Sequence, residues 1–200
     1  MTVGLYGGSF NPIHTGHTQL ASWLVEHGIV DELWLLVSPQ NPLKVNASLL
    51  DDRQRLHLAH LAVEGLRGVR VSDFEFRLPR PSYMVHTLAA LRLTYPDRDF
   101  VLVIGADNWH RFPQWYHADE IMRHHRILIY PREGFPIDEA ALPDGVILLQ
   151  TPLYDVSSTQ IRDAIAHNPA YNGFGLNPRV WAEIKAKGNF FNSQFTIHNS

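Results

Sequence analysis

The sequence predicts an α/β fold in which helices cover both faces of an open parallel sheet. Short apolar runs of strand length alternate with longer helical segments along most of the chain. The first three elements, Val3–Tyr6, Thr18 to about Glu26 and Glu32–Ser38, come in the order strand, helix, strand. Because strands joined through a crossover helix run parallel, this order predicts a βαβ unit.

The elements of the first half each carry a local signal. Val3–Tyr6 is a short apolar run closed by glycines, which indicates a buried strand. Two prolines in the loop Pro39–Lys44 exclude a helix there. Asp51–Glu64 is the clearest helix, because it has an apolar stripe and Asp51 can cap its start together with Gln54.

The second half continues the alternation. Phe100–Ile104 is the most apolar run, which predicts a central strand, and Pro96 ends the helix before it. Phe74–Arg80 alternates apolar and polar residues and is expected to be a loop or an edge segment. The other expected elements are the strands Val69–Asp73, Arg126–Tyr130 and Val146–Leu149 and the helices Ser82–Tyr95, Ser158–Ala166 and Pro178–Lys187.

Size and composition describe one domain. Two hundred residues suffice for a sizeable core, which we expect to span residues 1–188, followed by a loosely ordered tail, residues 189–200. The formal net charge of -3 argues against a general nucleic-acid binder. The chain has no cysteine, no signal-peptide pattern and no apolar run of membrane-spanning length, so we expect a cytoplasmic protein without a membrane partner.

The turn from the first strand into the first helix is typical of a phosphate site. Gly7 and Gly8 let an anion approach the backbone, and a helix start favours negative charge. His14 and His17 are three residues apart, so both can donate to phosphate oxygens. The glycines alone would also suit an ordinary turn. The histidines alone would suit half of a zinc site, but no third ligand stands at a telling spacing, and we expect no protein-bound metal.

Two further segments are expected at the same rim of the sheet. Gly105–Asn108 follows the central strand, and ligands of open α/β sheets bind beyond the carboxyl ends of the strands. At the start of a late helix, Ser157, Ser158 and Thr159 suit a phosphate, and Arg162 one turn later can fork onto its oxygens. The chain lacks both the P-loop motif and the G-x-G-x-x-G fingerprint, so a phosphate site must rest on these groups.

These motifs resemble those of the nucleotidyltransferase superfamily. Gly-Gly-Ser-Phe-Asn-Pro-Ile-His-Thr-Gly-His, residues 7–17, is similar to G-x-F-x-P-x-H-x-G-H, and Val156–Arg162 is similar to I-S-S-T-x-I-R with Val156 for the isoleucine. The Asn11-Pro12 version resembles nicotinate-nucleotide adenylyltransferases. The resemblance covers about residues 3 to 187 and implies a Rossmann-like, doubly wound sheet.

The resemblance implies transfer of AMP from ATP to nicotinate mononucleotide, giving deamido-NAD and pyrophosphate. The attacking phosphate monoester is already mostly dianionic near neutral pH, so alignment and charge neutralisation suffice and no general base is assigned. His14, His17 and Arg162 would stabilise phosphate charge, with Mg²⁺ brought by ATP. The implied ATP contacts are Gly7, Gly8, Ser9, Phe10, Lys44, Gly105, Asp107, Arg132, Ser157, Ser158 and Thr159.

The second substrate is implied by two segments. Pro81–Thr87 resembles P-S-Y-T-x-x-T, with Met84 in place of threonine and His86 in place of aspartate. Gly105-Ala106-Asp107 resembles the G-x-D segment that precedes a tryptophan stacked on the pyridine ring, and such stacking suits a flat cationic ring. The implied contacts are Tyr83, Thr87, Asp107, Asn108 and Trp115, with Trp109 as a competing stacking residue. Asp107 would meet ribose or magnesium.

Several alternatives remain open. The two departures lie where acid and amide mononucleotides would be distinguished, so a dual or nicotinamide-specific enzyme is one alternative. Pantetheine-phosphate adenylyltransferases and cytidylyltransferases are others, although the Pro-Ser-Tyr segment and the tryptophan argue against them. A synthetase fragment would need a K-M-S-K-S-like loop, which the chain lacks. A non-catalytic nucleotide sensor on the same fold is the most distant alternative, and a homo-oligomer is possible.

Overall fold

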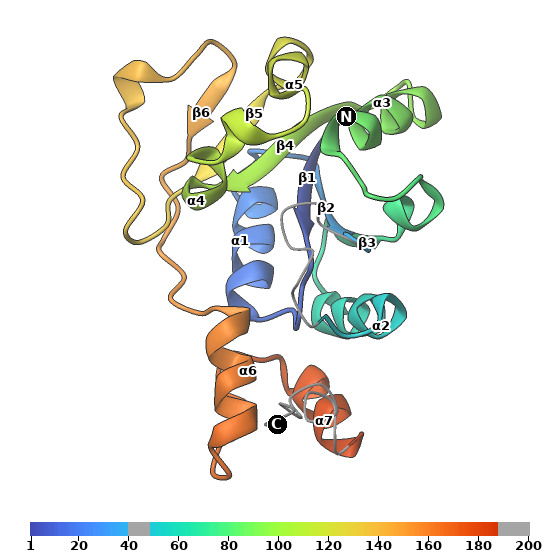
Figure 1. Cartoon of the computed structure of the whole chain (residues 1–200), viewed down its shortest axis with the longest axis vertical. Coiled ribbons are helices and arrows are strands. Elements are labelled where there is room, and N and C mark those ends of the chain that lie inside the picture. The colour runs from blue at the N-terminus through green and yellow to red at the C-terminus, as the bar shows by residue number, and fades with distance from the viewer. Residues whose placement is uncertain (40–48, 188–200) are drawn as a thin grey trace, which may run out of the picture.

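The protein, represented by a computed structural model that describes residues 1–39 and 49–187, is built on one six-stranded sheet. All neighbouring strands are parallel, in the order β3-β2-β1-β4-β5-β6 (Figure 1). This is the doubly wound order of a Rossmann-like fold, which confirms the predicted fold class. The strands are β1 (Thr2–Gly8), β2 (Glu32–Val37), β3 (Val69–Ser72), β4 (Asp99–Gly105), β5 (Ile127–Tyr130) and β6 (Val146–Leu148).

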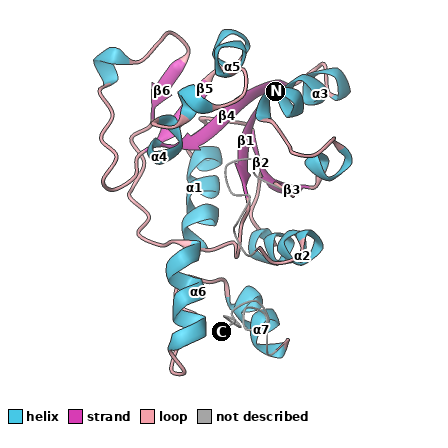
Figure 2. Cartoon of the chain, viewed as in Figure 1, coloured by secondary structure: helices cyan, strands magenta, loops and turns pink. Residues whose placement is uncertain are grey.

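Helices connect the strands and cover the sheet on both faces (Figure 2). Among the described residues the α-helices are α1 (Thr15–Glu26), α2 (Asp52–Val63), α3 (Met84–Thr94), α4 (Ala106–Trp109), α5 (Ala118–His124), α6 (Ser158–His167) and α7 (Pro178–Ala186). Short 3-10 turns are η2 (Phe74–Arg77), η3 (Phe112–Gln114) and η4 (Glu139–Ala141). None of these helices is long and apolar enough to cross a membrane.

Two apolar cores lie on opposite faces of the sheet. One core contains Leu24 of α1, Leu58 of α2 and Val180 of α7, packed on the strand residues that point to that face. The other contains Leu88 of α3 and Ile121 of α5. Because successive strand residues point to opposite faces, β1 supplies both cores, and its apolar run is continuous rather than alternating.

The predicted elements are confirmed with a few differences at their ends. Helix α1 begins at Thr15, three residues before the predicted start, because His14 takes the cap position. Part of the expected loop or edge segment, Phe74–Arg77, is a 3-10 turn. Helices α4 and α5 were not predicted, because seven residues or fewer are too short to show a helical period.

The order of the strands places the carboxyl ends of β1 and β4 side by side. The chain leaves β1 toward β2 and β3 and later winds the other way through β4, β5 and β6. The loops after the two central strands therefore diverge and leave a crevice at the rim. The pairing of Tyr6 with Val103 brings residues 7–17 and 105–108 to this rim, as predicted.

A fully buried arginine on α2 joins the segments that form part of this rim. Arg55 Nη1 donates to the carbonyl oxygens of Ser9 (2.5 Å) and Ser38 (2.9 Å), which follow β1 and β2. Its Nε donates to Leu50 O (3.0 Å), and Nη2 pairs with Asp52 Oδ1 (2.6 Å). A charged side chain is stable in an apolar core only when it is paired and hydrogen-bonded. Because its partners come from several segments, Arg55 holds the loop after β1 against β2 and α2.

We expect Arg55→Met to lower the free energy of unfolding by about 3–5 kcal/mol, because it leaves Asp52 and four carbonyl groups, those of Ser9, Ser38, Pro39 and Leu50, without their buried donor. Urea unfolding followed by tryptophan fluorescence measures the loss. The matched control is Arg53→Met, an exposed position on the same helix, for which we expect a change below about 0.5 kcal/mol. Equal stability of the two variants would contradict this role of Arg55.

Candidate active site

The loop after β1 turns sharply and packs its aromatic side chain inward. Phe10 has a φ of 44°, in the left-handed region, and its side chain is buried. A Cβ at Gly8 would lie 3.0 Å from Phe10 Cζ, so this close approach favours glycine. Gly7, Gly8 and Ser9 remain partly exposed beside it. The predicted phosphate-site turn after β1 is thus compact and has accessible backbone.

His14 and His17 lie together at the start of α1. His14 is the N-cap residue, its N–H donates to His17 Nδ1 (3.2 Å), and the two rings stack with centroids 3.6 Å apart. Because Nδ1 of His17 accepts this bond, the ring hydrogen of its neutral form is on Nε2. Phe10 packs edge-on against His17, with centroids 4.9 Å apart. The helix start therefore presents an oriented pair of imidazoles.

The pKa of His14 is lowered to about 3, first because burial disfavours the imidazolium and second because Arg132 carries a like charge. The side chain is only 5% exposed. Its Nδ1 has no hydrogen-bond partner among the described residues. His14 is therefore a neutral imidazole near pH 7, and its Nδ1 is buried at the start of α1.

The start of α6 docks onto the loop after β1. Ser158 Oγ donates to Pro12 O (2.9 Å), and Arg162 Nη1 donates to Asn11 O (2.8 Å). Arg162 also donates to Thr159 Oγ1 (3.2 Å). Ser157 caps the helix, because its Oγ accepts the N–H of Gln160. The two motifs, from distant parts of the sequence, meet at one place.

The segment after β4 forms the other side of the rim. A Cβ at Gly105 would lie 2.4 Å from Asp107 Oδ1 and 3.0 Å from the Tyr130 hydroxyl, so a larger residue there would displace the Asp107 carboxylate. Arg132 Nε lies 3.5 Å from Asp107 Oδ1. That buried oxygen makes no hydrogen bond within the described chain. The rim thus holds a carboxylate and a guanidinium close to the histidines.

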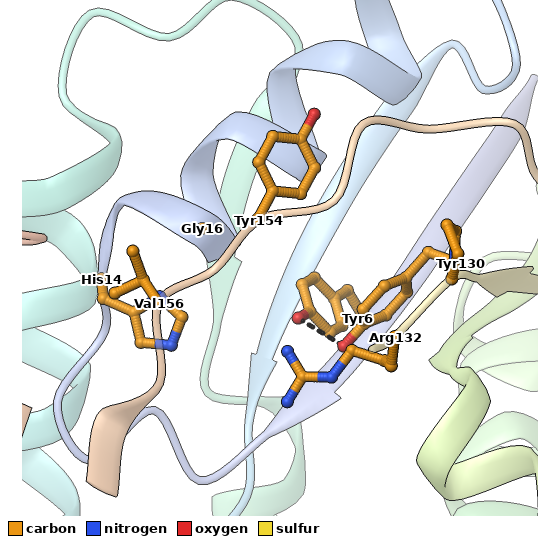
Figure 3. A pocket seen from close by; sticks show the side chains of 8 residues that line it. Tyr6, His14, Gly16, Tyr130, Arg132, Tyr154 and Val156 are labelled. Atoms are coloured by element: carbon orange, nitrogen blue, oxygen red, sulfur yellow. Dashed lines mark hydrogen bonds between the residues drawn. The ribbon is translucent and has the colours of Figure 1, made fainter. Parts of the chain in front are cut away.

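A pocket open to solvent lies between β1, the start of α1, the end of β5 and residues 154–156 (Figure 3). In this view Arg132 lies beside the rings of Tyr6 and Tyr130, and His14 and Val156 lie on the other side of the pocket. Tyr6 and Tyr130 were not among the predicted site residues. The signal that could have found them is position, since they end or nearly end β1 and β5 at the same rim. The lining residues are Tyr6, His14, Gly16, Tyr130, Pro131, Arg132, Tyr154 and Val156.

The residues predicted for the second substrate lie around α3 and η3. Tyr83 is the partly exposed N-cap residue of α3. Thr87 is fully buried and donates to Glu75 Oε1 (2.8 Å), so it faces a carboxylate of the protein. Trp115 packs against Phe112 with centroids 5.2 Å apart, and its Nε1 has no hydrogen-bond partner within residues 1–39 and 49–187.

Two further predicted contacts, Trp109 and Asn108, lie on α4, just before η3. Trp109 stacks on Phe112, with ring centroids 5.3 Å apart. Because Trp115 also packs against Phe112, both stacking candidates contact the same phenylalanine. Asn108 is partly exposed on α4 beside Asp107. Lys44 lies outside the residues that the structure describes. The described residues hold no group of three or more side chains that could bind a metal ion.

Known proteins resemble this chain in sequence and in fold. The model of the cytidylyltransferase-like family matches residues 5–164. A probable nicotinate-nucleotide adenylyltransferase of Bacteroides thetaiotaomicron is 51% identical over 92% of this chain and 91% of that protein. One of Bacteroides fragilis is 45% identical over 98% and 97%. The nicotinic acid mononucleotide adenylyltransferase of Plasmodium falciparum complexed with NaAD matches the fold at a TM-score of 0.82 and 18% identity, over 94% of this chain and 97% of that one.

The buried His14 predicts a dependence of stability on pH. Its pKa is about 3 in the folded protein and near 6.5 when unfolded, so only the unfolded chain takes up this proton between those values. The free energy of unfolding should therefore fall as pH falls below about 6.5. We expect the loss between pH 7 and pH 5 to be about 2 kcal/mol smaller in His14→Asn than in the unmodified protein.

Urea unfolding at the two pH values measures this difference. The matched control is His60→Asn, which changes an exposed histidine on α2 and should leave the pH dependence as it is. If His14→Asn and the unmodified protein lose the same free energy between pH 7 and pH 5, His14 does not titrate as described.

Proposed function

Because this chain belongs to the cytidylyltransferase-like family, and within it to the nicotinate-nucleotide adenylyltransferases, we propose that it transfers AMP from ATP to nicotinate mononucleotide. The products are deamido-NAD and pyrophosphate. One observation carries this proposal: Ser158 and Arg162 dock on the carbonyl groups of Pro12 and Asn11, directly before the stacked histidines. Donors from both motifs thereby converge where phosphates would bind.

The reaction needs alignment more than proton transfer. The phosphate of nicotinate mononucleotide attacks the α-phosphorus of ATP, a P–O bond forms, and the bond to the leaving pyrophosphate breaks. The nucleophile is already mostly dianionic, so no general base is required. His17 Nε2–H, neutral His14 and the Arg162 guanidinium stabilise the charge on the phosphoryl oxygens, and the site orients the two substrates in line.

The remaining ATP contacts follow from the site. Backbone groups of Gly7, Gly8, Ser9 and Phe10 lie at the turn after β1, where a phosphate can approach closely. Ser158 and Thr159 are at the start of α6, and Ser157 caps this helix, because its Oγ accepts the Gln160 N–H while its own N–H donates to Gln160 Oε1. Gly105 and Arg132 complete the rim opposite. Lys44 remains a sequence-based prediction.

A nucleotide-bound Mg²⁺ is consistent with the donor set. Asp107 Oδ1 is buried without a hydrogen-bond partner in the described chain, and carboxylate oxygens suit Mg²⁺. Asp107 would therefore meet the ion or the ribose. The bound ion would supply neutralisation of phosphate charge. The protein's own part is to hold Asp107 in place, through Arg132 and the tight packing at Gly105.

The pyridine ring is proposed to bind near α3 and η3. Trp115 offers its ring for stacking and an unpaired Nε1–H, while Tyr83 and Asn108 are partly exposed on the neighbouring turns. Trp109 is the competing stacking residue. Thr87 acts indirectly, because its hydroxyl is bound to Glu75 and holds the start of α3.

We propose residues 1–188 as one nucleotidyltransferase domain that acts in the cytoplasm, and the tail at residues 189–200 lies outside the described residues. The absence of a nucleic-acid or membrane partner and a homo-oligomeric state stay predictions of the sequence.

Pyrophosphate release tests the proposed function. The protein is mixed with ATP and Mg²⁺ and given nicotinate mononucleotide or nicotinamide mononucleotide separately. We expect release mainly with the acid. Comparable release with both indicates a dual-specificity enzyme, and release with phosphopantetheine alone indicates the related adenylyltransferase. ATP binding without release with any of the three contradicts the proposal and favours a sensor.

We expect His17→Ala to lower kcat by about 10²–10³-fold, because it removes a donor to charge that develops on the phosphoryl oxygens. Steady-state pyrophosphate release with nicotinate mononucleotide measures the effect. His60→Ala on α2 is the control for loss of an exposed histidine and should retain full turnover. Undiminished turnover in a folded His17→Ala variant would falsify the assigned role.

A further inference from the structure

Two tyrosine hydroxyl groups meet inside the pocket. Tyr6 comes from β1 and Tyr130 from the end of β5, and their hydroxyl oxygens are 3.0 Å apart (Figure 3). The rings meet edge to face, with centroids 5.6 Å apart. Tyr6 is 6% exposed and Tyr130 is 8% exposed, so both side chains are more than nine-tenths buried. Both line the pocket.

The hydrogens of this pair do not balance within the protein. Two hydroxyl groups carry two hydrogens, and the bond between them uses one. Neither hydroxyl makes another hydrogen bond with the described residues. Burial raises the pKa of both phenols, so both hydrogens remain in place near neutral pH. One buried O–H donor is therefore left without an acceptor, beside the pocket.

The groups around this donor indicate which ligand would accept it. Arg132, which lines the same pocket, carries only donors. Asp107 is the nearby carboxylate, but its Oδ1 makes no hydrogen bond with the hydroxyls. A ribose hydroxyl would bring a further hydrogen that needs an acceptor. A phosphate oxygen has acceptor sites only, and it can satisfy several of these donors at once.

We propose that the Tyr6–Tyr130 pair is a binding element of this site, which donates one O–H hydrogen bond to a phosphate oxygen of the bound nucleotide. One hydroxyl faces the ligand, and the second hydroxyl donates its hydrogen bond to the oxygen of the first. This bond makes the O–H that faces the ligand a better donor. The identity of the ligand as a nucleotide rests on the proposed function. The pairing itself requires tyrosine at both strand ends.

The test compares ligands with and without phosphates. Tyr6→Phe, Tyr130→Phe and the double variant are titrated with a non-hydrolysable ATP analogue, with inorganic pyrophosphate and with adenosine. We expect one single variant to weaken binding of the analogue about tenfold, because a hydrogen bond to a charged oxygen is lost. The other single variant should lose less affinity for the analogue. The double variant should bind as weakly as the single variant with the larger loss, because the pair supplies only one hydrogen to the ligand.

Adenosine affinity should be unchanged in all three variants. Tyr95→Phe is the matched control, because Tyr95 packs on Trp34 and Phe100 at the opposite end of the sheet. An unchanged ratio of analogue affinity to adenosine affinity in the double variant overturns the inference. An equal loss of affinity for both ligands leaves this ratio unchanged and would indicate a structural role only.

The outcome is separable from that of the proposed function. If the unmodified protein releases no pyrophosphate, but the variants bind the analogue or inorganic pyrophosphate more weakly, the proposed function is wrong and the inference holds. If the protein releases pyrophosphate while the affinity ratio is unchanged in the variants, the function holds and the inference is wrong. A protein that binds neither the analogue nor inorganic pyrophosphate loses both.

Discussion

The buried guanidinium of Arg55 is the interaction on which the rim of the sheet depends. A charge in an apolar core must be paired, and here the partners are Asp52 and the carbonyl groups of three separate segments. Satisfying one side chain therefore forces Ser9, Ser38 and Leu50 to lie together. The position of Ser9 in turn determines where the chain turns into α1.

The second constraint is the order of the strands. Because β1 and β4 are neighbours at the centre, the loops that follow them face each other across a crevice. Each side then contributes different chemistry: the imidazoles of His14 and His17 and the α6 donors on one side, and Asp107 with Arg132 on the other. The low pKa of His14 is a product of this arrangement, because burial disfavours the imidazolium and because Arg132, which follows β5, adds a like charge in the same pocket.

The parts that could be predicted from the sequence are those with a local signal. The strand Phe100–Ile104 is a continuous apolar run, and the two family motifs contain their own turn and cap residues. Tyr6 and Tyr130 could not be predicted, since a tyrosine at a strand end looks like any core residue until the sheet brings the two ends together. The burial of Thr87 was missed for a similar reason, because its partner Glu75 lies on a 3-10 turn expected to be a loop or an edge segment.

The docking of α6 on the loop after β1 also has a consequence for synthesis of the chain. Ser158 and Pro12 are 146 residues apart, and Arg162 and Asn11 are 151 apart. On the ribosome, β1, α1 and β2 emerge early and can pair, yet neither contact can form until α6 has left the exit tunnel. The nascent chain thus carries only the β1–α1 part of the candidate site through most of translation, and the part that α6 contributes joins it near the end of synthesis.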